Sequence, residues 1–545
     1  MRNEIRLPCH TTTSPGGAAS NGATMDRRNF LGLVGIAGAA LLTGCTPGAG
    51  SAGRGNTGGL AWSTRLHVPS VDTGTVAADG TRRFRLRAQA GRSQFISGKS
   101  TTTWGFNGPY LGPTLRAQSG ERVAMEVHNE LAESTTVHWH GMRLPAAMDG
   151  TPHQPVEAGS VWRPTWTIDQ PASTLWYHPH PHGDTAVHVY RGLAGMWIID
   201  DGIPDGLPGT YGSDDIPLII QDRNIGADGS LREDDTVPIW GLMGNDILVN
   251  GTHGPYLEVH TRLVRFRVLN ASNARMYNLR LSDGRPITIV GNDCALLPAP
   301  VQVDEISLSP AERAEIVVAF NPGETVILTS RSGDNGLDEG EFDILQLRAA
   351  TTLRTNGPVP SSLPGPAPIA PPADARTRRF VLSGNSKING REMEMGRIDE
   401  VVPVGATEIW EIDNTVYSHN FHVHDAAFSI LDIDGHDPPA YASGWKDTVF
   451  VGWPQDRQSG RHLRAPRRPD DAVHVPLPHP PARGQGHDGA VHRRRVRHAG
   501  VTAQRHARHR RPAQARSERQ LIEVDPNDFF VVEAPMGHGP AHMTW

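Results

Sequence analysis

From residue 60 onwards the chain is a succession of short runs in which apolar and polar residues alternate. Residues 83–89 read RFRLRAQ, 122–128 read RVAMEVH and 263–269 read LVRFRVL, and clusters of Gly, Pro, Asn and Asp separate such runs. Alternation with a period of two places the apolar side chains on one face of a β-strand. No stretch shows the period of a long amphipathic helix. The pattern therefore predicts an all-β chain made of β-sandwiches.

The 545 residues are enough for three domains of about 150 residues each. We predict a first sandwich at 60–205, a second at 206–354, a linker rich in Pro, Ala and Ser at 355–377, and a third sandwich at 378–455. A formal net charge of −6 gives no indication of a nucleic-acid partner. Three cysteines (Cys9, Cys45 and Cys294) are too few for a disulfide framework or a thiolate metal cluster.

Residues 1–50 are predicted to hold an export signal. Residues 26–45 read DRRNFLGLVGIAGAALLTGC: paired arginines, a short apolar run, then Leu-Thr-Gly before Cys45. This layout resembles a signal read by the twin-arginine translocase and ending in a lipobox, in which Cys45 carries a membrane lipid anchor. A plain cleaved signal with an incidental cysteine is the alternative. Met25 stands at the natural start of such a signal, so 1–24 are predicted to precede the true start, and the Gly-rich 46–59 to form a tether.

Three histidine clusters carry the chemistry. They read TVHWHG at 136–141, WYHPHPHG at 176–183 and SHNFHVHDAAF at 418–428. Residues i and i+2 of a strand point to the same face, so each cluster offers a pair of imidazoles to one side. Imidazole is a ligand for copper, zinc, iron and nickel. Three such pairs from separate segments predict a site for several metal ions, formed by His138, His140, His178, His180, His422 and His424.

The motifs HWHG, WYHPHPHG with GLAG at 192–195, and HNFHVH resemble those of the multicopper oxidases, laccase-like enzymes of three cupredoxin-like Greek-key β-sandwich domains. The resemblance covers residues 65–450. It implies that His138 and His422 bind the type 2 copper. The type 3 copper pair is then bound by His140, His178, His180 and His424, and His419 is a ligand of the type 1 copper.

The resemblance also implies a catalytic role for Asp149, as a carboxylate that holds water near the type 2 copper and supplies protons. A simple turn residue before Gly150 is the alternative for this position. His153 and His182 have no counterpart among the family's ligands, and we expect them at the surface or behind the ligands.

A fourth motif of the family is missing, because no cysteine follows Cys294. The family pattern requires His-Cys-His-x3-His-x4-Met near the carboxyl end, and its cysteine binds the type 1 copper, so the type 1 site is predicted to be absent here. Residues 457–519 instead contain 16 Arg and eight His and no aromatic residue, Ile, Met or Cys. Such a composition argues against a strand core, so the third domain is predicted to be incomplete.

A basic tail that binds polyanions is one interpretation of the aberrant segment at 456–520. A frameshift near 452–456 is the other, and the codons favour it. Read one base later, residues 474–491 can encode the missing motif in register, with cysteine at the place of Leu477. Residues 521–545 have no assignment.

The sequence thus predicts an exported, copper-dependent oxidoreductase. It would couple one-electron oxidation of a small phenolic, aromatic or metal-ion substrate to the four-electron reduction of O2 to water, and this polypeptide would be impaired in that activity. A copper-free periplasmic scaffold of the cell-division type is the alternative, although such a scaffold has no reason to keep seven ligand histidines. A cuprous-ion oxidase would be expected to have more methionines than Met393 and Met395 near the type 1 site.

Overall fold

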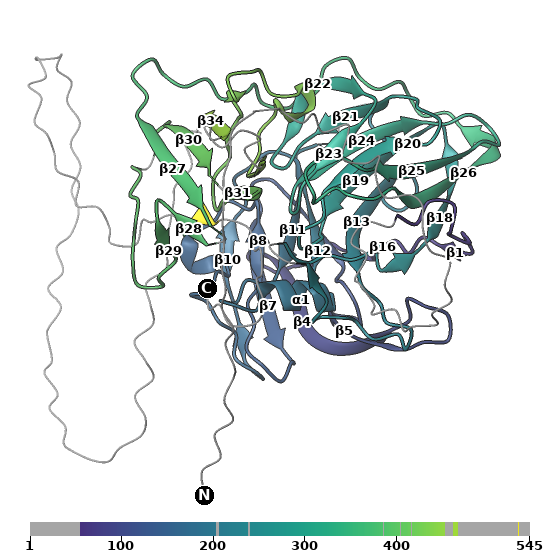
Figure 1. The fold of residues 1–545 in the computed structure, drawn as a ribbon, viewed down its shortest axis with the longest axis horizontal. Helices are drawn as coiled ribbons and strands as arrows, with labels where there is room; N and C mark the ends of the chain where they lie inside the picture. The colour runs from purple at the N-terminus through teal and green to yellow at the C-terminus, as the bar shows by residue number, and fades with distance from the viewer. Residues whose placement is uncertain are drawn as a thin grey trace, which may run out of the picture. The chain divides into compact units, whose positions relative to one another are not determined.

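The computed structural model of the chain describes residues 55–452 except 203–205, 238–239, 385, 404 and 416, together with two further strands at Arg461–Pro466 and Val532–Glu533. Strands dominate these residues, and the only α-helix among them is α1 (Thr185–Arg191) (Figure 1). The predicted all-β class is confirmed. No helix in the described part is long and apolar enough to span a membrane.

Two sheets formed by residues 71–200 enclose one core. The first has the order β2-β6-β12-β11-β8, with bounds Val71–Asp72, Thr114–Gln118, Gly195–Asp200, Ser173–His178 and His138–His140. The second has the order β10-β7-β4-β3, with bounds Thr165–Thr167, Arg122–Asn129, Arg82–Ser93 and Thr75–Val76; β5 (Thr101–Phe106) pairs with β4, and β9 (Val161–Trp162) pairs with β7.

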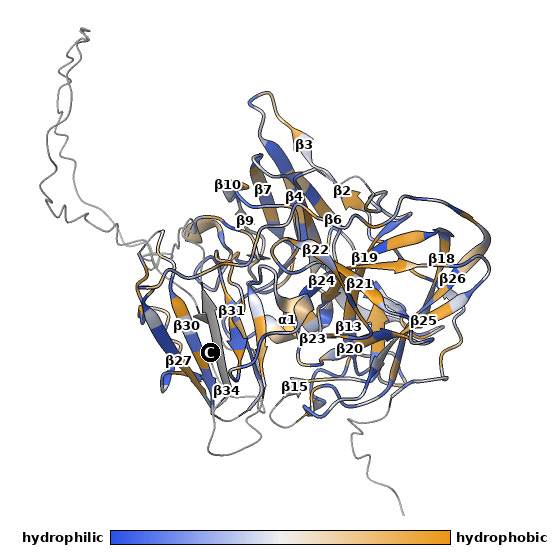
Figure 2. Ribbon diagram, turned by 90° about the horizontal axis from the view of Figure 1, so that it is seen from above, coloured by the Kyte–Doolittle hydropathy of each residue, from blue (hydrophilic) through white to orange (hydrophobic). Residues whose placement is uncertain are grey.

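The alternation read from the sequence is borne out in β4. Phe84, Leu86 and Ala88 are buried while the arginines between them are exposed. Figure 2 shows the hydrophilic residues along β4 and β7. The buried side chains pack against Trp139, Tyr177 and Trp197 of the first sheet. This core fixes the sheet that carries the first two histidine clusters.

A second pair of sheets follows. One has the order β17-β16-β13-β19-β24-β21-β22, with bounds Thr252–His253, Asp246–Val249, Asp215–Arg223, Leu263–Asn270, Arg313–Ala319, Ile287–Gly291 and Leu296–Val303. The other has the order β1-β18-β26-β25-β20-β23, with bounds Thr64–Arg65, Pro255–Thr261, Phe342–Arg354, Thr325–Arg331, Tyr277–Leu281 and Ile306–Leu308. A short ribbon joins β14 (Thr236–Val237) to β15 (Gly241–Leu242).

The strand β19 differs from its sequence pattern. LVRFRVL predicts a strand with one exposed, polar face, but Arg265 and Arg267 are both buried. Arg265 pairs with Glu315, and Arg267 lies 2.7 Å from Asp215 and 3.0 Å from Glu315. A guanidinium can be buried when carboxylates satisfy it, and a period of two cannot distinguish that case from exposure.

The third group has a sheet in the order β29-β28-β27-β30-β34-β32, with bounds Arg391–Glu392, Lys387–Ile388, Thr377–Ser383, Ile409–Asn414, Arg461–Pro466 and Asp432–Ile433. Its second sheet has the order β33-β31-β35, with bounds Thr448–Val451, His419–Val423 and Val532–Glu533. Composition argues against a strand core after residue 456, and the first sheet contains one backbone-paired strand there, since β34 pairs with β30 along six residues. Such pairing is made by backbone groups, which any composition supplies except proline.

The remaining predictions for the chain ends lie outside the described residues. They concern the export signal, Cys45, residues 467–520 and most of 521–545.

Candidate metal centre

The first histidine pair is held by β8. His138 and His140 point away from the core, whereas Trp139 between them is buried in it. The neighbouring strand β11 is antiparallel and places His178 opposite His138. Trp176 stacks on His178 with ring centroids 4.0 Å apart. Strand parity and a tryptophan on each strand therefore orient these imidazoles.

The third cluster joins the first although about 280 residues separate them in sequence. The ring of His422, on β31, stacks on His140 with centroids 3.7 Å apart, and the ring of His424 stacks on His138 at 4.2 Å. His180, just beyond β11, lies 5.5 Å from both His138 and His424. The structure thus brings together all six histidines that were predicted to share one site.

The Nδ1 atoms of His138 and His422 each donate a hydrogen bond to a backbone carbonyl. His138 Nδ1 lies 3.0 Å from the carbonyl oxygen of Asp149, and His422 Nδ1 lies 2.9 Å from that of Asp447. A carbonyl can only accept, so both Nδ1 atoms carry the proton and both Nε2 atoms keep a lone pair. The Nε2 atoms are buried and have no hydrogen-bond partner. Buried acceptors of this kind are costly unless something binds them.

The Asp149 carboxylate lies between two of the imidazoles. Its Oδ2 accepts from Nδ1 of His424 at 2.7 Å, and its Oδ1 lies 3.0 Å from Nδ1 of His138. Asp149 is 3% exposed. Its carboxylate therefore fixes the tautomer and orientation of His424, and its backbone carbonyl those of His138, which is more than a turn residue does.

His140 has the opposite orientation. Its Nε2 lies 3.2 Å from Oδ1 of Asp447, which accepts the proton, so the lone pair is on Nδ1. Nδ1 in turn faces Nε2 of His178 at 3.4 Å. His178 donates from Nδ1 to the Pro179 carbonyl at 2.8 Å, so its Nε2 is also an acceptor. Two acceptor nitrogens at this distance repel unless a cation lies beside them.

Burial favours the neutral form of four of these imidazoles. It lowers the pKa values of His138, His140 and His178 below the ordinary value, and it lowers that of His422 to about 3. Ligand atoms within 4.8 Å of one another form three sets that could each hold a metal ion: His138, His140 and His178; His138, His422 and His424; and His140, His422 and Asp447. Neutral nitrogens with lone pairs aimed into a common space suit copper.

His419 occupies a different position. It begins β31 and, being three residues from His422, lies on the other face of the strand. It is buried, burial lowers its pKa to about 4, and its Nε2 has no hydrogen-bond partner. These properties fit a ligand nitrogen at a separate site.

The two unassigned histidines lie outside the cluster. Nε2 of His153 lies 2.9 Å from the carbonyl of Met395, and His182 is exposed.

Asp447 is a residue of the site whose role sequence reasoning missed. Besides His140, its carboxylate accepts from Arg313 of β24 at 2.8 and 2.6 Å, and all these side chains are buried. The adjacent Lys446 lies 2.9 Å from Asp293 and 3.0 Å from Glu312. Burial disfavours its charge, but these two carboxylates outweigh burial and raise the pKa of Lys446. The sequence signal that could have indicated Asp447 is the run Trp445–Thr448, which contains one of only three lysines in the chain next to an aspartate.

The comparisons with known proteins agree with this geometry. The multicopper oxidase family profile matches residues 87–203 and 366–458, which contain all seven predicted ligand histidines. A solved structure of a laccase-like multicopper oxidase, CueO of Ochrobactrum sp., is 35% identical, with a TM-score of 0.68 over 75% of this chain and 94% of its own. The chain belongs to the multicopper oxidase family.

Other multicopper oxidase structures are similar too. The laccase of Pediococcus acidilactici is 34% identical, with a TM-score of 0.68 over 74% of this chain and 87% of its own. Among curated proteins, the cell division protein FtsP of Escherichia coli (strain K12) is 35% identical over 442 residues, which are 78% of this chain and 90% of the relative. Family membership implies copper as the cofactor, and the six clustered histidines fit that ion.

Proposed function

We propose that the chain is a copper-dependent oxidase that couples one-electron oxidation of a small phenolic, aromatic or metal-ion substrate to reduction of O2 to water. The observation that carries this proposal is the buried cluster of six imidazoles, in which Nδ1 of His140 faces Nε2 of His178 and the Nε2 atoms of His138 and His422 have no hydrogen-bond partner. A protein selected only as a scaffold would gain stability by replacing such groups with apolar side chains.

We assign the six histidines of the cluster to two kinds of copper site. His138 and His422 would hold the type 2 ion, and the type 3 pair would be held by His140, His178, His180 and His424. Copper, when bound, would supply the one-electron redox steps that reduce O2 to two waters.

The protein's own groups prepare this site. Asp149 holds His138 and His424 in the tautomer that leaves Nε2 available, and its carboxylate is placed to pass protons at Oδ1 or Oδ2. Asp447 orients two more imidazoles: its carboxylate, whose charge Arg313 balances, leaves Nδ1 of His140 available, and its backbone carbonyl leaves Nε2 of His422 available. Rigid ligands of this kind reduce the cost of ordering the site around a metal.

This polypeptide lacks the cysteine ligand of the type 1 copper, the site at which electrons from the substrate would enter. His419 is present, but no cysteine follows Cys294 in the sequence. Cys294 itself is buried with its Sγ 3.3 Å from Oδ2 of Asp447, and burial raises its pKa. We therefore propose that the chain as printed has little oxidase activity, and that a frameshift near 452–456 removed the thiolate, with Leu477 at its place.

Oxygen uptake tests this proposal. The copper-loaded chain and a version with the frame restored would be compared with a phenolic substrate in an oxygen electrode. We expect copper-dependent uptake from the restored chain and little from the printed one. Copper binding without any uptake by the restored chain would contradict the oxidase function.

A copper-free scaffold role remains the second candidate, because the similar FtsP proteins are named cell division proteins. A scaffold predicts that the restored chain binds no copper, and metal analysis of that protein separates the two roles.

We also propose export through the twin-arginine translocase, with Cys45 as a lipid anchor. Mass spectrometry of the mature amino terminus tests this proposal. A lipidated Cys45 is expected, and a mature terminus without acylated cysteine would contradict the anchor.

A further inference from the structure

The solvent-exposed face of the second sheet carries a groove that the metal centre does not use. It is a hollow of about 700 Å³ between the turn that precedes β3 and the strand β10. Its floor is one register row across the sheet: Thr75, Arg83, Ala124 and Thr165. Three of these four side chains are small, which is why the sheet is hollowed here.

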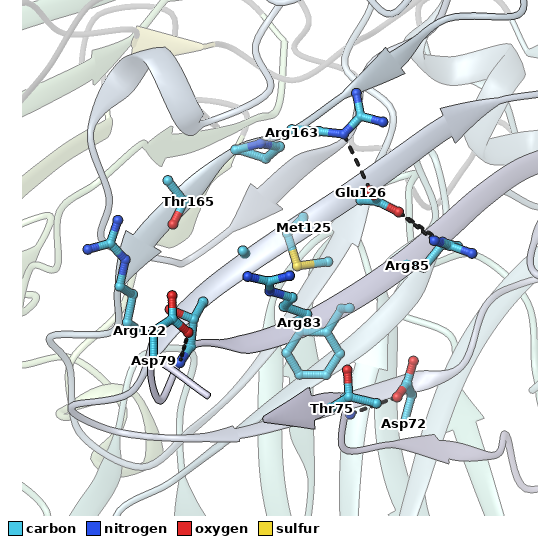
Figure 3. A pocket seen from close by; sticks show the side chains of 15 residues that line it. Asp72, Thr75, Asp79, Arg83, Arg85, Arg122, Met125, Glu126, Arg163 and Thr165 are labelled. Carbon is cyan, nitrogen blue, oxygen red and sulfur yellow. Dashed lines mark hydrogen bonds and ion pairs between the residues drawn. The ribbon is translucent and has the colours of Figure 1, made fainter. Parts of the chain in front are cut away.

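Four guanidinium groups surround the floor, from Arg83, Arg85, Arg122 and Arg163 (Figure 3). Glu126 binds two of them, Arg85 at 2.8 Å and Arg163 at 3.4 Å. Figure 3 shows this chain of three residues on one side of the groove. The other two guanidiniums have no carboxylate within ion-pair distance in the part of the chain that the structure describes.

The carboxylates that line the groove are already engaged. Asp72 accepts from the backbone N–H of Gly74 at 2.8 Å, and Asp79 accepts from that of Thr81 at 3.1 Å. With Glu126 they make three negative charges against four positive ones. The net charge of the lining is therefore +1, and Arg83 and Arg122 are the two guanidiniums of the groove that make no ion pair among the described residues.

The spacing of these two arginines selects the ligand. Arg83 pairs in register with Ala124, so Arg122 is its diagonal neighbour, one strand across and two residues along. Strand geometry puts the two Cα atoms roughly 8 Å apart. In an extended peptide, side chains at i and i+2 share a face and are about 6.7 Å apart. An arginine fork binds a carboxylate through two N–H groups.

We propose that this groove binds an extended acidic segment of a partner protein, with one carboxylate at i and another at i+2. Arg83 and Arg122 each take one carboxylate, and the hydroxyl of Thr75 is placed to bond the segment's backbone, whereas that of Thr165 already donates to the Val123 carbonyl at 2.9 Å. The core of Phe84, Val123 and Trp139 separates the groove from the histidines. Partner binding is therefore independent of copper.

Two peptides of identical composition provide the test. In Gly-Ser-Glu-Gly-Glu-Ser-Gly the glutamates are two apart, and in Gly-Ser-Glu-Glu-Gly-Ser-Gly they are adjacent. Fluorescent versions would be titrated with the full-length protein at low salt, because exposed ion pairs are screened. We expect the first peptide to bind several-fold more tightly than the second, and its affinity to fall with added salt.

Matched variants locate the site. The double variant Arg83→Gln, Arg122→Gln should weaken binding of the first peptide about tenfold, since each exposed pair contributes up to about fivefold. The double variant Arg87→Gln, Arg92→Gln removes the same amount of charge from positions of β4 outside the groove and should bind normally. All these side chains are exposed, so folding should be unaffected.

Three results would overturn the proposal. They are absence of binding by either peptide, equal affinity for both, or equal loss in the two double variants. Inorganic phosphate serves as the competing small anion. Displacement of the peptide by an equal concentration of phosphate would show a small-anion site instead.

Discussion

Replacing Asp447 by asparagine tests whether the buried charges behind the metal centre stabilise the fold. The substitution keeps the shape and removes the charge that balances Arg313, whose two contacts with Asp447 are 2.8 and 2.6 Å long. Arg313 would keep three backbone carbonyls, of Thr174, Ala311 and Asp293. Its nearest remaining carboxylate would be Asp293, at 3.7 Å.

Removing one partner of a buried ion pair costs about 3–5 kcal/mol. Because asparagine has the same shape as aspartate and Arg313 keeps its carbonyl contacts, we expect a loss in the free energy of unfolding at the lower end of this range, about 3 kcal/mol. Since 1.36 kcal/mol is a factor of ten, this is roughly a 150-fold change in the folding equilibrium.

The control is the same substitution at an exposed carboxylate. Asp399 also binds two arginines, Arg391 at 2.8 Å and Arg397 at 2.9 Å, but its side chain is 46% exposed. Asp399→Asn should cost no more than about 1 kcal/mol.

Urea unfolding of both full-length variants, followed by tryptophan fluorescence, gives the two free energies. Equal destabilisation by Asp447→Asn and Asp399→Asn would refute the reasoning, because both carboxylates bind arginine and only that of Asp447 is buried.

Three further outcomes follow from the same structure. Asp149→Ala should lower copper affinity about 10–100-fold, since it removes the carboxylate that orients His424 and lies beside His138, and an unchanged calorimetric titration would contradict this role. The metal-free protein should lose stability below pH 6.5, because the unfolded chain protonates its histidines there while the folded pKa values of His419 and His422 are about 4 and 3. Each should cost about 1.4 kcal/mol per pH unit over that window, and identical melting temperatures at pH 7 and pH 5 would show that these histidines are not buried neutral. The copper-loaded chain with its frame restored, and cysteine at 477, should be intensely blue while the printed chain is not; a blue printed chain would overturn the proposed loss of the thiolate.

The sequence alone predicted burial and side-chain direction where the period of a single strand determines them. The alternation in β4 predicted which residues are buried, and the His-x-His spacing predicted that His138 and His140 share a face. His180 and His424 lie just beyond the ends of β11 and β31, so strand parity alone did not fix their direction. Neighbouring strands and the Asp149 carboxylate orient the cluster.

Ion pairs and hydrogen bonds between residues far apart in the sequence could not be predicted from local patterns. Arg265 and Arg267 read as an exposed face, but carboxylates from other strands bury them. The contact of Asp447 with both His140 and Arg313 joins residues more than 130 positions apart, and neither periodicity nor composition encodes it.

Copper content tests the central claim most directly. The full-length chain would be loaded with copper, desalted and measured by mass spectrometry, beside the double variant His138→Ala, His422→Ala and, as a control, His260→Ala. His260 is an exposed histidine on β18. The account predicts tightly held copper in the unchanged chain and in the control, with substantial loss in the double variant. No bound copper in the unchanged chain, or an equal amount in all three, would contradict it.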